Sequence, residues 1–215
     1  PSAAAVEARM KGGLERIDVV IAFASVALEQ EELVRGIREA SGTAALLFGC
    51  TDAGEITNMG PSQKSVAVLA IQSDTVKFSI GIQENVKGGP REAGQGVARK
   101  LKAQEEITGP LRAFIMLPDV LTGNGASLAF EMARAMGFVP TLVLAPFGGG
   151  GLATGLAYGL ALEAGESLER NRRVWGVQSD ASAAMALSLA EGAAVTRLPA
   201  EGETLAEGLE GGISV

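Results

Sequence analysis

Residues 140–155 read Pro-Thr-Leu-Val-Leu-Ala-Pro-Phe-Gly-Gly-Gly-Gly-Leu-Ala-Thr-Gly. The apolar run between the prolines predicts a buried β-strand, the glycines a loop, and the residues from Leu152 onward a helix. Glycines without a Cβ can adopt positive φ and let a ligand lie against backbone N–H groups. The free amides of the helix first turn and the helix dipole would attract a phosphate or carboxylate. The stretch therefore predicts an anion-binding unit formed by Gly148, Gly149, Gly150, Gly151 and Leu152, against the alternative of a tight turn without a ligand.

The composition is typical of a globular α/β protein. The 215 residues are 47% hydrophobic, which is enough to fill a core, and no apolar run reaches the length of a membrane span. The net charge of −7 and the aromatic content of 4% argue against nucleic acid as a partner. We therefore expect a cytoplasmic protein that binds neither nucleic acid nor a membrane.

Two absences restrict the chemistry further. The chain has no histidine, which excludes a Ser-His-Asp triad, a histidine zinc site and a histidine-ligated haem within it. Its single cysteine, Cys50, excludes an intrachain disulfide and a thiolate cluster. We expect no catalytic residue of these types and no metal site.

The apolar segments predict a three-layer α/β fold with a mixed, mostly parallel sheet and helices on both faces. Segments 65–71 and 75–82 are rich in β-formers and separated by Gln-Ser-Asp, which favours a hairpin. The predicted strands begin near residues 17, 44, 65, 75, 112, 140 and 173. The predicted helices cover residues 29–40, 90–104, 126–137, 152–164 and 182–191.

A second candidate site follows the predicted strand at 44–50, where small and polar residues replace the apolar run. Ligands of open α/β sheets bind at the carboxyl ends of strands, so Cys50, Thr51, Asp52 and Glu55 are candidate ligand-binding residues. Cys50 could be a reactive thiol, but a small core residue is the commoner use of such a cysteine. Asp52 and Glu55 could bind an amino group, although helix caps and solvated turns are commoner for carboxylates.

Four motifs between residues 17 and 126 resemble the N-terminal half of the FIST sensory domain of bacterial signalling proteins. They are residues 19–25, Phe-Gly-Cys-Thr-Asp-Ala-Gly-Glu-Ile at 48–56, residues 65–71, and Leu-Pro-Asp-Val-Leu-Thr-Gly-Asn-Gly at 117–125. The second is the most specific, and Asn124 in the last joins the candidate ligand-binding residues. The resemblance implies a small ligand such as an amino acid. Some relatives sense nitric oxide through haem, for which this chain has no histidine ligand.

Residues 118–215 resemble the later part of fold-type II pyridoxal-phosphate enzymes of the threonine dehydratase and serine racemase group. The resemblance rests on residues 123–131, on Ala-Pro-Phe-Gly-Gly-Gly-Gly-Leu-Ala-Thr-Gly at 145–155, and on segments around 175–178, 184–192 and 204–212. It implies that the glycine loop holds the phosphate of pyridoxal phosphate. The family's cofactor-linking lysine motif is absent, Gln178 replaces a usual Glu, and Ala184 replaces a metal-binding Asp of the racemase type.

The sequence thus predicts a FIST-like segment at 1–125 joined to a pyridoxal-phosphate-enzyme-like segment at 126–215, within one continuous domain. Such a junction suggests recombination of two fragments, natural or engineered, or a truncation. We expect a non-catalytic sensory domain that holds a small anionic or amino-acid-like molecule between residues 50–55 and the glycine loop. The alternatives are a pyridoxal-phosphate-dependent ammonia-lyase and a recombined scaffold with no selected ligand. A homo-oligomer or a missing partner domain would be compatible with each.

Overall fold

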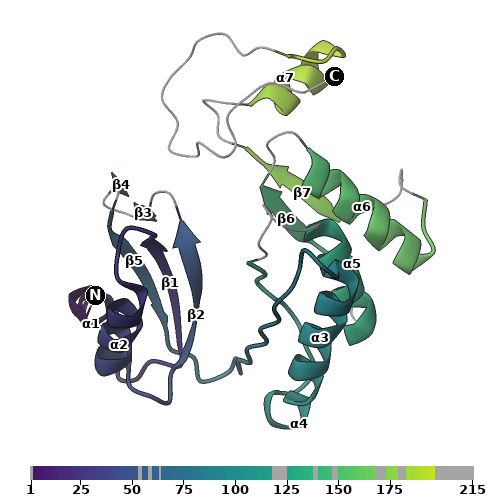
Figure 1. The fold of residues 1–215 in the computed structure, drawn as a ribbon. Coiled ribbons are helices and arrows are strands. Elements are labelled where there is room, and N and C mark those ends of the chain that lie inside the picture. The colour runs from purple at the N-terminus through teal and green to yellow at the C-terminus, as the bar shows by residue number, and fades with distance from the viewer. Residues whose placement is uncertain are drawn as a thin grey trace. The chain divides into compact units, whose positions relative to one another are not determined.

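The computed structural model describes residues 2–52, 55–57, 60–62, 64–117, 125–137, 140–146, 150–167, 173–178 and 183–196. The chain divides into two compact units (Figure 1). The first comprises Pro1–Ile80 and Gln104–Pro110, and the second comprises Gly81–Ala103 and Leu111–Val215.

Both units contain helices and strands. The first unit contains α1 (Ser2–Gly12), β1 (Val19–Ser25), α2 (Gln30–Ser41), β2 (Leu46–Asp52), β3 (Glu55–Thr57), β4 (Gly60–Ser62), β5 (Val66–Ile71) and α4 (Glu105–Thr108). The second contains α3 (Pro90–Lys102), α5 (Gly125–Met136), β6 (Val143–Pro146), α6 (Gly151–Ala164), β7 (Val174–Val177) and α7 (Ala184–Glu191). Among the described helices, none is long and apolar enough to cross a membrane.

The first unit is built on a three-stranded sheet with the order β2-β1-β5. Strand β1 runs parallel to β2 and antiparallel to β5, so that Ile21 lies opposite both Phe48 and Leu69. Six of the seven β1 residues are buried, as is typical of a central strand. The short strands β3 and β4 form a separate antiparallel pair between β2 and β5 in the chain.

Helix α2 covers one face of this sheet. Its apolar residues Leu33 and Ile37, four apart and therefore on one face of the helix, are buried against alternate residues of β1. Gly42 ends the helix with φ 83°, and its N–H donates to the carbonyl of Arg38. This positive φ is the reason that glycine follows the last helical residue.

The second unit contains a close pair of helices and a parallel strand pair. Pro90 lies in the first turn of α3, where its missing N–H removes no helical hydrogen bond. Helices α3 and α5 bury Ala98, Leu101, Met132 and Met136 between them and their neighbours. Strands β6 and β7 pair in parallel, with Val143 opposite Val174.

The strand–loop–helix unit predicted around the glycines is present as β6 followed by α6. Ala145 of β6 is buried with Ala129 of α5 and Ala153 and Leu156 of α6. The three alanines among them are small and leave room for the helices to lie close to the strands. The helices predicted at 29–40, 90–104, 126–137, 152–164 and 182–191 correspond to α2, α3, α5, α6 and α7.

The α/β fold class, with mixed strand directions and helices packed against strands, is confirmed. The strands of the described residues form three sheets. The predicted hairpin between 65–71 and 75–82 is wrong, because residues 75–82 contain no strand and β5 pairs with β1 instead. Pairing with β1 also lets Val66, Val68 and Ala70 of β5 pack against the core formed by β1 and α2. A two-stranded ribbon would lack such a core.

The predicted strand at 112–117 is also absent. Its alternating residues Phe114 and Met116, together with Leu111, pack against the core shared by α3 and α5. The alternation therefore records burial of every second side chain along an irregular segment, not participation in a sheet.

Candidate functional site

The carboxyl ends of β1 and β2 meet at one edge of the first unit's sheet. Ser25 and Asp52, the last residues of the two parallel strands, lie opposite each other in register. Because side chains of paired residues point to the same face of a sheet, the hydroxyl and the carboxylate share a face. Open α/β sheets bind ligands at this edge.

Ser25 is held in place by bonds to three segments. Its side chain is buried, and its Oγ accepts a hydrogen bond from the N–H of Ala27 at 3.3 Å. Its backbone N–H donates to the carbonyl of Ser65 at 3.1 Å, and its carbonyl accepts a bond from Nε2 of Gln30 at 3.1 Å. Gln30 also donates to the carbonyl of Leu28 at 2.8 Å. The turn from β1 into α2 is therefore fixed at the edge of the sheet.

A pair of serine hydroxyls lies on the neighbouring segment that enters β5. Oγ of Ser62 and Oγ of Ser65 are 2.7 Å apart, within hydrogen-bond distance. Since the carbonyl of Ser65 accepts the Ser25 N–H, this pair is connected to the end of β1. The edge thus combines hydroxyl groups with the Asp52 carboxylate.

Cys50, Thr51 and Asp52 belong to strand β2 and not to the predicted turn after it. Cys50 lies opposite Phe23, and Thr51 lies opposite Ala24, so their side chains alternate between the two faces. Cys50 and Asp52 consequently share the face of Ser25. Cys50 is exposed, so its interpretation as a small core residue is wrong. Strand β2 is an edge strand of the described sheet and pairs there with β1.

The electrostatics of this edge disfavour thiolate chemistry. Partial burial, and after it the negative charge of Asp52, raise the pKa of the Cys50 thiol. A thiol with a raised pKa stays protonated at neutral pH and is a poor nucleophile. The edge can therefore donate and accept hydrogen bonds and bind a positive charge.

Several predicted site residues lie outside what the structure describes. Glu55 begins β3, but the placement of its side chain is not described. Asn124, Gly148 and Gly149 are outside the described residues.

The described part of the glycine loop has the backbone that the sequence predicted for its turn. Gly150 is buried with φ 86° and ψ −12°, a left-handed conformation that favours glycine. Gly151 and Leu152 begin α6, and the first bond of the helix runs from the N–H of Thr154 to the carbonyl of Gly150. In an α-helix the N–H groups before that bond have no partner within the helix. A methyl group on Gly151 would meet no atom within 4 Å, so the approach to this first turn is open on that side.

Gln178 directly follows β7, at the same end of the β6–β7 pair as the glycine loop. Its Oε1 accepts a hydrogen bond from the N–H of Ala186 in α7 at 3.3 Å. The side chain thus fastens α7 to the end of β7. Among the described residues, no group of three cysteine, aspartate or glutamate side chains is placed to hold a metal ion.

Sequence reasoning missed Ser25, Gln30 and Ser65. Ser25 ends the apolar run of β1 just as Asp52 ends β2, and this common position was the available signal. Gln30 and Ser65 carry no motif. Their place at the edge depends on the strand register and on the turn into α2.

A sequence model of the FIST N domain family matches residues 18–195. No curated protein and no solved structure matches the chain. The match runs well beyond residue 126, where the predicted FIST-like segment ended, and includes the glycine loop. It provides no support for a junction near that residue. The resemblance of residues 118–215 to pyridoxal-phosphate enzymes stays a prediction.

Proposed function

The chain belongs to the FIST N domain family, a family of sensory domains, and on that premise we propose that it binds an amino-acid-like molecule without catalysing a reaction on it. The observation that carries the proposal is the pairing of Ser25 with Asp52 at the carboxyl ends of β1 and β2. This edge is where the α/β architecture places ligands.

The chemistry of the edge favours a ligand with an amino group. The Asp52 carboxylate would attract an ammonium group, and hydrogen bonds to a charged partner are stronger than neutral ones. The hydroxyls of Ser25, Ser62 and Ser65 lie in the same region and would suit polar groups beside the ammonium. The protonated Cys50 thiol supplies no nucleophile, which supports binding without covalent chemistry.

A thermal-shift screen of the full chain against the standard L-amino acids, followed by calorimetric titration, tests this proposal. We expect an amino acid to bind, and its hydroxy-acid analogue, such as lactate for alanine, to bind at least about tenfold more weakly (~1.4 kcal/mol). Asp52→Asn should remove this preference, because it removes the charge that selects the ammonium group. Glu32→Gln, a charge-matched change on the exposed surface of α2, should preserve the preference.

Two results would contradict the proposal. One is the absence of stabilisation by any amino acid at millimolar concentration. The other is an undiminished preference for the amino acid over the hydroxy acid in the Asp52→Asn variant.

A second candidate function, anion binding, is favoured by the left-handed Gly150 at the start of α6. The first-turn amides of Gly151 and Leu152 would hold a phosphate group, such as that of pyridoxal phosphate. That cofactor would act as an electron sink that stabilises carbanions when linked to a lysine. The family's lysine motif is absent from this sequence, so we propose phosphate binding without lyase activity.

Calorimetric titration with inorganic phosphate and with pyridoxal phosphate tests the second candidate. Gly150→Ala should weaken binding, because an alanine there is strained at positive φ and shifts the loop. Gly165→Ala is the matched control, since Gly165 has φ 64° at the other end of the same helix and has open space around it. Equal affinities in these two variants would contradict anion binding at the glycine loop.

A further inference from the structure

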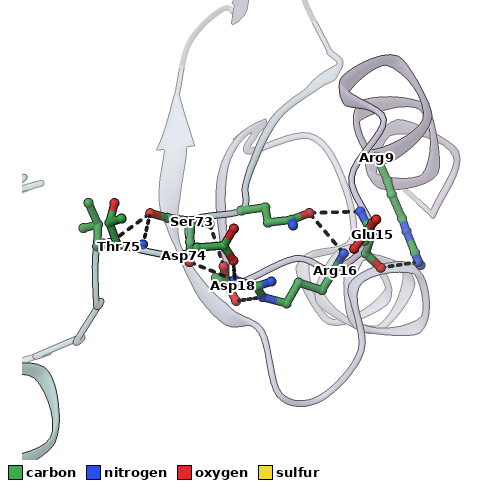
Figure 2. A network of polar contacts seen from close by, with 9 residues as sticks. Arg9, Glu15, Arg16, Asp18, Ser73, Asp74 and Thr75 are labelled. Carbon is green, nitrogen blue, oxygen red and sulfur yellow. Dashed lines mark hydrogen bonds and ion pairs between the residues drawn. The ribbon is translucent and has the colours of Figure 1, made fainter.

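A polar network joins the start of β1 to the segment that leaves β5 (Figure 2). The two strands are antiparallel, and Val19 pairs with Ile71 at the end of their ladder. The N–H of Asp18 adds one more bond, to the carbonyl of Ile71 at 2.8 Å. Beyond it the chain continues through residues 72–80 with no strand, up to Ile80, where this part of the first unit ends. We call residues 75–80 the connector.

Arg16 lies at the centre of the network. Its Nε donates to Oδ1 of Asp18 at 2.9 Å. Its Nη2 donates to Oδ1 of Asp74 at 2.7 Å and to the carbonyl of Ser73 at 2.8 Å. The other carboxylate oxygen of Asp18 accepts the N–H of Ser73 at 2.8 Å. One guanidinium and one carboxylate therefore hold Ser73 and Asp74 from both sides.

The network extends in both directions along the chain. Oε1 of Gln72 accepts the N–H groups of Glu15 and Arg16 at 2.9 and 3.2 Å. Oγ of Ser73 accepts hydrogen bonds from the N–H groups of Thr75 and Val76, at 3.3 and 2.9 Å. Thr75 and Val76 are the first residues of the connector. In these bonds the backbone N–H groups are paired with side-chain oxygens. In a strand they would be paired with the backbone carbonyls of a neighbouring strand.

The network is also open to water. The side chain of Arg16 is 47% exposed and that of Asp74 is 82% exposed, whereas β1 beside them is buried. Exposed ion pairs contribute little to stability, because water competes for both partners. Elements held by exposed polar bonds open more readily than a buried ladder.

We propose that Arg16 is a releasable latch: it orders the first residues of the connector, and its loss frees them while the β1–β5 ladder stays intact. Arg16 is a positioning residue in this proposal, since it acts through Asp18, Ser73 and Asp74. The proposal is independent of the ligand at the other edge of the sheet.

Residue-resolved hydrogen exchange of the full chain tests the latch. In Arg16→Met, exchange at the amides of Ser73, Thr75 and Val76 should accelerate about threefold or more. Exchange at Ile21 and Leu69, which lie opposite each other as a hydrogen-bonded pair of the β1–β5 ladder, should stay unchanged. Arg35→Met is the matched control, because Arg35 is also an exposed arginine paired with a carboxylate, here Glu32 on α2.

Ser73→Ala separates the two halves of the network. It removes the Oγ acceptor, so it should accelerate Thr75 and Val76 but leave the Ser73 amide protected by Asp18. Asp74→Asn, at a side chain too exposed to be needed for folding, should produce a smaller acceleration at the same three amides and serves if Arg16→Met does not fold. Unchanged exchange at these amides would overturn the latch. So would equal acceleration of the ladder amides, which would make Arg16 a support of the sheet.

Discussion

A Cβ atom added to Gly49 would lie 1.8 Å from the carbonyl oxygen of Ala22 and 2.8 Å from its carbonyl carbon. The two residues lie opposite each other in the parallel β1–β2 ladder. No side chain fits at such a distance, because the φ of 159° at Gly49 directs the position of a Cβ atom toward β1 and not toward a face of the sheet. The candidate site begins one residue later, at Cys50.

Gly49→Ala should separate β1 from β2 and lower the free energy of unfolding by at least about 3 kcal/mol, because backbone atoms must move. It should also abolish amino-acid binding at the sheet edge. Urea unfolding followed by circular dichroism measures the first effect. Gly192→Ala is the control: its φ of 67° and ψ of 17° are left-handed and strain alanine by about 1–2 kcal/mol, but no atom lies within 4 Å of the added methyl. Equal destabilisation of both variants would refute the steric account.

Gly94→Ala should weaken the packing of α3 against α5. The added Cβ would lie 2.6 Å from the carbonyl oxygen of Leu128 and 3.1 Å from the backbone nitrogen of Met132. Overpacking of this kind costs about 1–3 kcal/mol. Gly151→Ala, where the methyl meets open space, should leave the unfolding free energy nearly unchanged. Thermal unfolding of the two variants, measured side by side, checks the prediction.

Glu131 is a buried carboxylate between these helices, and its removal should be costly. Its oxygens accept bonds from Nε of Arg91 at 3.1 Å and Nε2 of Gln95 at 3.1 Å, and Arg134 lies 3.6 Å away. Glu131→Ala should cost about 3 kcal/mol, because it leaves a cavity and removes the acceptor shared by Arg91 and Gln95. Arg91→Ala should cost less, about 1 kcal/mol, because Gln95 and Arg134 still contact the buried carboxylate. The opposite order in urea unfolding would contradict this assignment.

Asp18 predicts an acid-sensitive contribution to stability. The N–H of Ser73, and after it Arg16, lower the pKa of its carboxyl group. A depressed folded-state pKa stabilises the fold above the unfolded-state value of about 4, and this stabilisation is lost as the pH falls through the lower folded-state pKa. Asp18→Asn should therefore be less stable than the parent at pH 7, and the difference should shrink in acid. Unfolding curves measured from pH 7 downward check this, and a stability difference that persists unchanged into acid would contradict it.

Cys50 should react slowly with thiol reagents at neutral pH although it is exposed. Partial burial and Asp52 raise the pKa of its thiol, so the reactive thiolate is scarce. The rate of alkylation by iodoacetamide, followed against pH, should reach half its maximum above the pH found for free cysteine. Asp52→Asn should move that midpoint toward lower pH. A midpoint below that of free cysteine would show that the thiol is activated.

Local pattern was sufficient where one element determines the outcome. The sequence predicted the strand that begins near residue 17, the helix at 29–40, and the strand, loop and helix of residues 140–155. In each case the hydrophobic period and the backbone freedom of glycine act within a few residues.

Pairing was not available from the sequence. Segments 75–82 and 112–117 have the composition of strands, but a strand also needs a partner with free backbone groups, and the edge of β1 opposite β2 pairs with β5. The juxtaposition of Ser25 with Asp52 depends on the register of β1 and β2, and that register brings Gly49 against Ala22. The sequence by itself therefore determined which residues favour strands, helices and turns. Only the tertiary structure decided which of them meet, because hydrogen bonds between strands join residues that no local pattern relates.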